Sequence, residues 1–228
     1  MTTLTPLSID VSNEKVSAIA SLPNAASACV VFAHGAGAGM NHPFIAAVCE
    51  GLAARRIATL RYQFPYMEKG RSRPDPPNLC HKTVEAAVAV AHQLMPTLPL
   101  FAGGKSFGGR MTSQAQAIAP LPHVRGLCFF GFPLHAANRP ATARADHLSA
   151  ITIAMLFLQG TRDSLALFPL MRGVVARLGS SVDLKVIEHA DHSFHVLARS
   201  GTTDSEVLAS MLDEVSTWTA ALSAKAPS

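Results

Sequence analysis

Short apolar stretches alternate with segments of helical periodicity along most of this chain. Apolar runs predict strands over residues 29–33, 58–62, 100–102, 126–131, 154–159 and 183–188. Apolar residues at helical spacing predict helices over residues 43–56, 81–95, 110–119, 165–178 and 203–221. Residues 7–11 and 16–22 predict an opening hairpin. Continuously apolar strands that alternate with helices are typical of a mostly parallel sheet covered on both faces. The pattern therefore predicts an α/β fold of about eight strands that binds its ligand at their carboxyl ends.

Length and composition fit one globular domain over residues 1–228. Hydrophobic residues make up 49% of the chain and charged residues 15%, which argues against disorder. No apolar run has the length of a membrane span, and the first residues lack the pattern of a signal peptide, so we expect a cytoplasmic protein that does not bind membranes. The net charge of +4 is modest, and no nucleic-acid motif accompanies it, so no nucleic-acid partner is expected. The composition carries no signal for an oligomeric state.

A Gly-x-Ser-x-Gly pattern stands between a predicted strand and a predicted helix, with Gly104, Ser106 and Gly108 at its fixed positions. A serine on such a sharp turn has its hydroxyl lifted clear of the sheet, and small neighbours leave room for the strained backbone. The following helix directs the positive end of its dipole toward this hydroxyl. The pattern alone also fits a tight turn without chemistry, but the flanking strand and helix favour a nucleophile at Ser106.

A serine nucleophile needs a histidine base and a carboxylate that orients the histidine. In this type of sheet the chain order is serine, acid, histidine. Asp163 follows a late apolar strand, and His192 lies in the loop after the last predicted strand, where His195 is an alternative base. The histidines of this loop lack the spacing of metal ligands, so we predict no metal ion.

The glycine-rich segment over residues 35–39 follows an early predicted strand and is suited to close backbone approach. An oxyanion hole requires backbone donors, one of which should be the N–H of Phe107, the residue after the nucleophile. The second donor should be the N–H of Gly35 or of Ala36, and the sequence does not choose between them. The segment lacks G-x-G-x-x-G spacing, so neither a dinucleotide nor any other cofactor is predicted.

Several stretches of the chain resemble a known family: HGAGAGMNHPF, LRYQFPYMEKGRSRPDPP, FAGGKSFGGRM, GFPLH, LFLQGTRD and HADHSFH. They are similar to the small α/β-hydrolase-like proteins of bacteria, close to the dienelactone hydrolase branch. Relatives of these proteins include a testis-expressed vertebrate protein and the hydrolase-like domain of a chromatin-complex subunit. The resemblance extends from about Cys29 to the end and implies an α/β-hydrolase fold with Ser106, Asp163 and His192 as its triad. Dienelactone hydrolases use cysteine as the nucleophile, so the serine here points to ester cleavage instead.

These features predict a serine hydrolase that cleaves a small carboxylic ester or thioester through an acyl-enzyme on Ser106. Arg61, Tyr62, Tyr66 and His135, together with the segment RPDPP, either shape the substrate pocket or only pack the loops around it. The loops after the strands are short, so a minimal lid is expected. Two alternatives stay open. One is a catalytically silent hydrolase fold that acts as a binding or assembly module, and the other, less favoured, is a peptidase.

Overall fold

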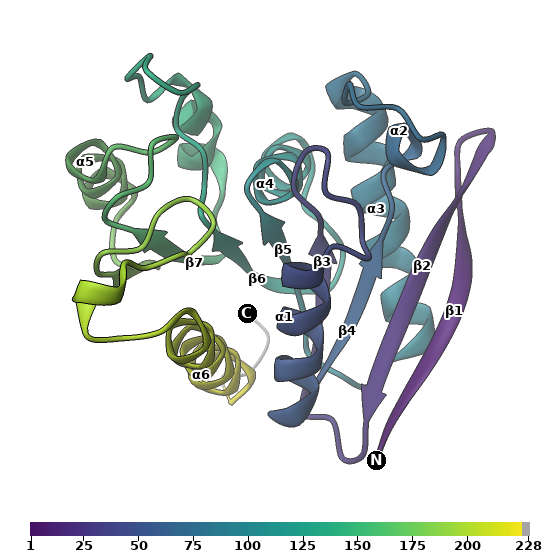
Figure 1. Cartoon of the computed structure of the whole chain (residues 1–228). Coiled ribbons are helices and arrows are strands. Elements are labelled where there is room, and N and C mark those ends of the chain that lie inside the picture. Colours follow the sequence, from purple (N-terminus) through teal and green to yellow (C-terminus); the bar gives the residue numbers. More distant parts are fainter. Residues whose placement is uncertain (225–228) are drawn as a thin grey trace.

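Eight strands form one sheet in the order β1-β2-β4-β3-β5-β6-β7-β8 (Figure 1), in a computed structural model that describes residues 1–224. The strands are β1 (Thr2–Val11), β2 (Glu14–Pro23), β3 (Ala28–Ala33), β4 (Ile57–Tyr62), β5 (Leu100–Lys105), β6 (Val124–Phe130), β7 (Ala154–Gly160) and β8 (Val182–Ile187). The α-helices are α1 (Pro43–Ala54), α2 (Pro65–Glu68), α3 (Pro77–Leu94), α4 (Phe107–Ile118), α5 (Phe168–Leu178) and α6 (Asp204–Ser223). Two 3₁₀ segments, η1 (Ala143–Ala150) and η2 (Ala198–Ser200), lie between them.

The sheet is parallel from β4 to β8, and an antiparallel hairpin extends one edge. β1 pairs with β2, and β2 pairs with β4, both antiparallel. The remaining neighbours are parallel, because a helix crosses over between successive strands. The predicted α/β fold with a mostly parallel sheet of eight strands is thereby confirmed.

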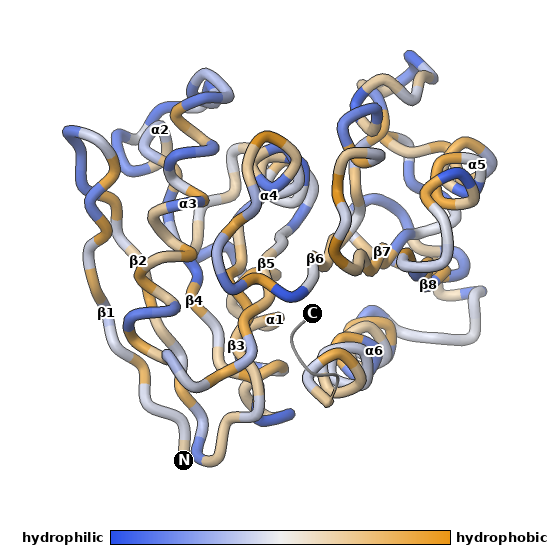
Figure 2. Tube along the Cα trace, turned by 180° about the vertical axis from the view of Figure 1, so that it is seen from behind, coloured by the Kyte–Doolittle hydropathy of each residue, from blue (hydrophilic) through white to orange (hydrophobic). Residues whose placement is uncertain are grey.

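Helices cover both faces of the sheet, and each face has its own hydrophobic core. Helices α1 and α6 lie on one face of the sheet, and α3, α4 and α5 lie on the other (Figure 1). Buried side chains of α1 and α6 belong to one hydrophobic cluster, and those of α3, α4 and α5 belong to the other. Every residue of β3 is buried, which explains why its sequence shows no polar alternation. Figure 2 shows the hydrophobic colouring along the central strands. Among the described helices, none has both the length and the apolarity needed to cross a membrane.

The starts of α3 and α5 differ from the predicted ones, and both differences have local causes. α3 begins at Pro77, four residues before the predicted start, because proline is suited to the first turn of a helix. α5 begins only at Phe168, since the side chain of Asp163 accepts the N–H of Leu165 and holds the preceding residues in a turn. This turn has a role in the site described next.

The parallel strands bring distant segments to one edge of the sheet. The loops that follow β3, β5 and β7 leave the same edge and carry Gly35, Ser106 and Asp163, respectively. The loop after β8, at the end of the sheet, carries His192. The sheet thus assembles residues that are far apart in the sequence.

Candidate active site

Ser106 occupies the sharp turn between β5 and α4 with a backbone conformation that serine rarely adopts. Its φ is 51° and its ψ is −115°, a strained combination that is found where the surrounding structure enforces it. The neighbouring glycines allow this turn to approach β3. A Cβ on Gly104 would lie 2.3 Å from the carbonyl oxygen of Ala33, and a Cβ on Gly108 would lie 2.5 Å from that of His34. The two glycines of the motif are therefore a steric requirement of this turn.

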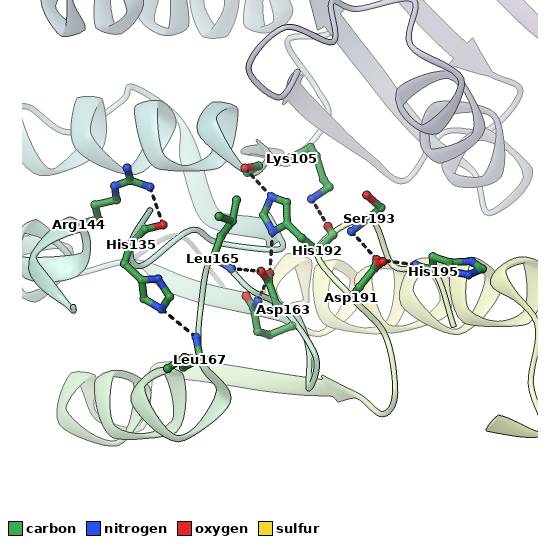
Figure 3. Close-up of polar contacts among 12 residues, drawn as sticks. Lys105, His135, Arg144, Asp163, Leu165, Leu167, Asp191, His192, Ser193 and His195 are labelled. Carbon is green, nitrogen blue, oxygen red and sulfur yellow. Dashed lines mark hydrogen bonds and ion pairs between the residues drawn. The ribbon is translucent and has the colours of Figure 1, made fainter. Parts of the chain in front are cut away.

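Ser106, His192 and Asp163 form a continuous chain of hydrogen bonds. The distance between Ser106 Oγ and His192 Nε2 is 2.8 Å, and that between His192 Nδ1 and Asp163 Oδ2 is 2.7 Å. Figure 3 shows the imidazole ring of His192 next to Asp163. A proton on Nδ1 satisfies both contacts, since Nδ1–H then donates to the carboxylate and Nε2 accepts the hydroxyl proton. The structure thus brings together the three residues that the sequence places in the order serine, acid, histidine.

The carboxylate of Asp163 is held from three directions. Besides His192, Gln159 donates its side-chain amide to Oδ2 at 2.6 Å, and the backbone N–H of Leu165 donates to Oδ1 at 2.8 Å. Asp163 is almost fully buried. All three contacts use the carboxylate as an acceptor, so its orientation and that of the imidazole are fixed together.

The loop that carries His192 is itself fixed by Asp191 and Lys105. Oδ1 of Asp191 accepts the backbone N–H groups of Ser193 and His195 at 2.8 and 3.0 Å. Nζ of Lys105 donates to the carbonyl oxygen of His192 at 2.6 Å (Figure 3). Burial lowers the pKa of Lys105 to about 8, against the opposing influence of Asp163 and Asp191. The contact between Lys105 and His192 was not predicted from the sequence, because it joins the end of β5 to the loop after β8.

The other histidines of this loop point elsewhere. Nδ1 of His195 lies 2.8 Å from Oδ2 of Asp204 at an exposed position, and this hydrogen bond raises the pKa of His195. His189 is exposed, and its backbone N–H donates to the side chain of Thr161. Of the two candidate bases in the sequence, the structure brings His192 to Ser106.

A turn after β3 presents free backbone donors next to Ser106. The N–H of Ala38 donates to the carbonyl oxygen of Gly35, and Gly37 has a φ of 72°, as the third residue of a type II turn requires. Within residues 1–224, the N–H groups of Gly35 and Ala36 donate to no protein acceptor. The N–H of Phe107, at the first position of α4, has no partner within its own helix. Ala36 and Phe107 line the same cavity as Ser106, and an oxyanion hole requires backbone donors beside the nucleophile.

Two buried aromatic side chains, His34 and Tyr66, form hydrogen bonds with this turn. His34 is fully buried; its Nδ1 lies 2.8 Å from the carbonyl oxygen of Gly35, and its Nε2 accepts the N–H of Phe64 at 3.1 Å. Burial lowers the pKa of His34 to about 4, which favours the neutral ring that both contacts require. The hydroxyl of Tyr66 accepts the N–H of Gly37 at 3.2 Å. Both side chains thus hold the turn in place.

A cavity of about 400 Å³ opens beside Ser106. Its lining comes from the turn after β3, the loop before α3, the first turns of α4, and the loops after β6 and β7: Ala36, Pro74, Asp75, Pro77, Ser106, Phe107, Arg110, Met111, Pro133, Arg144 and Leu165. A volume of this size suits a small-molecule ligand. The segment RPDPP therefore does contribute to the cavity, through Pro74, Asp75 and Pro77.

The four single residues expected around the substrate have other positions. Arg61 lies beside Cys49 on the α1 face of the sheet, and Tyr62 is fully buried in the opposite core. Tyr66 supports the turn after β3. Nε2 of His135 accepts the N–H of Leu167 at 3.1 Å, so His135 holds the loop before α5 (Figure 3). Among the described residues that line the cavity, none of these four side chains occurs.

The sequence analysis did not identify the two arginines of the cavity wall, Arg110 and Arg144. Arg110 follows Ser106 by one helical turn, and this spacing was the one signal in the sequence that could have drawn attention to it. Arg144 comes from η1, in a connection whose path only the tertiary structure reveals. In the part of the chain that the structure describes, no group of three histidine, cysteine or acidic side chains has the arrangement of a metal site.

Comparison with known proteins agrees with this architecture. A family model described as an alpha/beta hydrolase domain matches residues 26–220. A dienelactone hydrolase from Anabaena variabilis is 22% identical, with a TM-score of 0.76 over 95% of this chain and 96% of that one. An α/β serine hydrolase without lid from Xanthomonas campestris is 17% identical, with a TM-score of 0.73 over 94% of each chain. Est1E from Butyrivibrio proteoclasticus, solved with ferulic acid bound, is 18% identical, with a TM-score of 0.70 over 92% of this chain and 99% of that one.

At these identities the solved structures are evidence of a shared fold alone. The family model, in contrast, spans most of the sequence and includes the turn at Ser106, the acid loop and the histidine loop. This chain therefore belongs to the alpha/beta hydrolase family.

Proposed function

We propose that this protein is a serine hydrolase that cleaves a small carboxylic ester or thioester through an acyl-enzyme on Ser106. The observation that carries the proposal is the continuous contact from Ser106 Oγ through His192 to Asp163, at 2.8 and 2.7 Å. Such a chain of contacts activates a serine hydroxyl, because the imidazole accepts its proton and the carboxylate stabilises the imidazolium that forms.

The reaction proceeds in two halves. Oγ of Ser106 attacks the ester carbonyl while Nε2 of His192 takes the hydroxyl proton, and the carbonyl oxygen becomes an oxyanion held by the N–H groups of Phe107 and Ala36. The bond to the leaving oxygen or sulfur breaks, and His192 returns the proton to the leaving group. A water molecule then attacks the acyl-enzyme with His192 as the base, which releases the acid and restores Ser106.

We assign the second oxyanion donor to Ala36 because Ala36 lines the same cavity as Ser106 and Phe107. The positive end of the α4 dipole adds to the stabilisation of the oxyanion. The proposed ligand of this protein is thus a small-molecule ester, which is its substrate. The cytoplasmic location and the relationship to the vertebrate and chromatin-complex proteins stay predictions from the sequence.

A fluorophosphonate probe tests the proposal without knowledge of the substrate. We expect one covalent adduct on the peptide that contains Ser106, and its loss in Ser106→Ala and His192→Ala. Ser193→Ala is the matched control, since Ser193 is exposed in the same loop as His192 and should leave labelling unchanged. A folded protein that forms no adduct with this probe or with the smaller phenylmethylsulfonyl fluoride, and hydrolyses no short ester, would instead be a binding module.

A further inference from the structure

Two arginines share the cavity with Ser106, at positions that the proposed reaction does not use. Arg110 extends from the first turn of α4, and Arg144 from η1. Ser106, Phe107 and Ala36 line the same space. A substrate with its carbonyl carbon at Ser106 therefore fills a cavity whose wall also presents two guanidinium groups.

Neither arginine has a carboxylate partner. No ion pair joins Arg110 or Arg144 to an acidic side chain within residues 1–224, whereas Arg55 elsewhere on the surface pairs with Asp213 at 2.7 Å. Nε of Arg110 is buried without a hydrogen-bond partner, and its guanidinium carbon lies 5.8 Å from the centre of the Phe107 ring. Arg144 donates one hydrogen bond, from Nη1 to the carbonyl oxygen of His135 at 2.9 Å (Figure 3). Most of the donors of this pair are thus unused by the protein.

The residues around Arg110 and Arg144 supply less negative charge than the two guanidinium groups carry positive charge. Burial, together with the neighbouring guanidinium of Arg144, lowers the pKa of Arg110, so the two positive charges act on one another. Burial and the charge of Arg110 lower the pKa of His147 to about 4, which keeps that ring neutral at pH 7. Asp75 is the acidic residue of the cavity wall, and its Oδ2 accepts the N–H of Tyr66 at 2.7 Å. The pair therefore leaves this side of the cavity positively charged.

A partly buried pair of like charges without an ion-pair partner is costly to maintain unless an anion binds to it. Arginine presents planar donors that match a carboxylate, often through two parallel hydrogen bonds. We propose that Arg110 and Arg144 form a carboxylate subsite, and that the substrate is an ester that carries a free carboxylate in addition to its scissile bond. This inference rests on the proposed hydrolase function and names the substrate class for it.

Matched pairs of esters test the subsite. The first pair places the charge on the acyl side and compares the 4-nitrophenyl monoester of adipic acid with 4-nitrophenyl 6-oxoheptanoate, in which a methyl ketone replaces the carboxylate. The second pair places it on the alcohol side and compares the butyrate ester of 4-hydroxybenzoic acid with that of methyl 4-hydroxybenzoate. We expect the anionic member of at least one pair to have a kcat/KM about 10- to 100-fold higher than its neutral partner, the size of effect that charge-assisted hydrogen bonds produce.

Substitutions then assign the preference to the two arginines. In Arg110→Gln and Arg144→Gln, we expect kcat/KM for the preferred anionic ester to fall about 10- to 100-fold, mainly through KM, with much smaller change for the neutral ester. Arg110→Lys should retain part of the preference because the charge remains. Arg56→Gln is the matched control, since Arg56 is exposed before β4, at the opposite end of the sheet from Ser106.

A measurement on the unaltered protein does not depend on the folding of any variant. Adipate should inhibit hydrolysis of the neutral ester at a concentration at least about tenfold lower than adipamide, the neutral diamide of the same length, and added salt should weaken this difference. Equal kcat/KM within both ester pairs, together with equal inhibition by adipate and adipamide, would overturn the subsite. Hydrolysis of the neutral esters and the adduct at Ser106 report on the hydrolase function separately, so either proposal can fail without the other.

Discussion

The two sides of Ser106 differ in how completely the protein satisfies their polar groups. On the side of His192, the protein itself supplies the partners: Asp163 accepts three hydrogen bonds, and Lys105 and Asp191 fix the histidine loop. On the side of the cavity, two arginines line the wall without a carboxylate partner, and Nε of Arg110 has no hydrogen-bond partner at all. The residues of the proposed triad are held in position by other protein groups. The arginines proposed to contact the substrate lack such partners in the protein.

This difference has a physical reason. Groups that stabilise charge in a transition state are effective when their orientation is fixed in advance, because no reorganisation is then needed during the reaction. Groups that bind a substrate contribute most to the binding free energy when the ligand supplies their hydrogen-bond partner. Substitutions on the two sides should consequently differ in kind: those on the His192 side should affect every ester, and those at the arginines only anionic ones.

The largest effect on catalysis is expected for Asp163→Asn, a substitution on the side of His192. Three donors face the carboxylate, so an asparagine amide must direct its NH₂ group at one of them in either orientation. When the NH₂ group replaces Oδ2, Nδ1 of His192 must accept a hydrogen bond, so Nε2 carries the proton and no longer accepts that of Ser106. We expect kcat to fall about 10⁴-fold for charged and neutral esters alike, as measured by steady-state kinetics. A loss restricted to anionic esters would contradict the division between the two sides.

Ala36→Pro should have the next largest effect. Ala36 is the second residue of a type II turn, a position that proline fits, so the substitution removes the N–H donor and leaves the turn intact. Loss of one oxyanion donor should lower kcat about 10²- to 10³-fold with little change in KM. Circular dichroism and the melting temperature serve as the folding control. An unchanged kcat in a folded variant would assign the donor to Gly35.

Acid should destabilise the protein through His34, which supports the turn after β3. The pKa of His34 is lowered by burial to about 4 in the folded protein, whereas a histidine in the unfolded chain titrates near 6.5. Its contribution to stability is present above pH 6.5 and is lost as the pH falls toward 4, because the unfolded chain binds the proton first. Between pH 7 and pH 5 we expect the free energy of unfolding to drop by about 2 kcal/mol from this residue.

The variant His34→Gln isolates this contribution. Urea unfolding at pH 7 should give a lower free energy of unfolding for His34→Gln than for wild type. At pH 5 the difference between the two proteins should be smaller. A constant difference across this range would exclude His34 as the titrating group.

The smallest expected effect concerns Lys105, which positions His192 through its backbone. Below pH 8 the ammonium group holds the loop by a charge-assisted hydrogen bond; above the lowered pKa of about 8, Lys105 loses its proton and with it the attraction to Asp163 and Asp191. Wild-type kcat should therefore decline by about threefold to tenfold above pH 8. Lys105→Met should have a similarly reduced kcat at pH 7 and lack this decline. The pH profile separates positioning from a general loss of structure.

Stability should follow the opposite course at Lys105. Because the folded pKa lies below that of the unfolded chain, the folded protein releases the proton first, and wild type should gain stability relative to Lys105→Met between about pH 8 and 10.5. A parallel pH dependence of the two proteins would contradict the lowered pKa of Lys105.

Much of this architecture could be predicted from local features of the chain. The apolar runs predicted the strands because strands covered on both faces need no polar alternation. The glycines around Ser106 indicated the sharp turn, since only glycine tolerates the approach of β3 at Gly104 and Gly108. Ser106, Asp163 and His192 could be selected because each of them follows a predicted strand, in the order serine, acid, histidine that this type of sheet requires.

The sequence by itself determined the fold class, the turn at Ser106 and the candidate loops for the acid and the base, because each depends on residues within one strand, helix or loop. Only the tertiary structure decided that His192 rather than His195 contacts Ser106, and that Arg110 and Arg144, rather than Arg61, Tyr62, Tyr66 and His135, line the cavity. These contacts join side chains that are far apart along the chain. Their geometry depends on how the loops pack against one another, which no local pattern encodes.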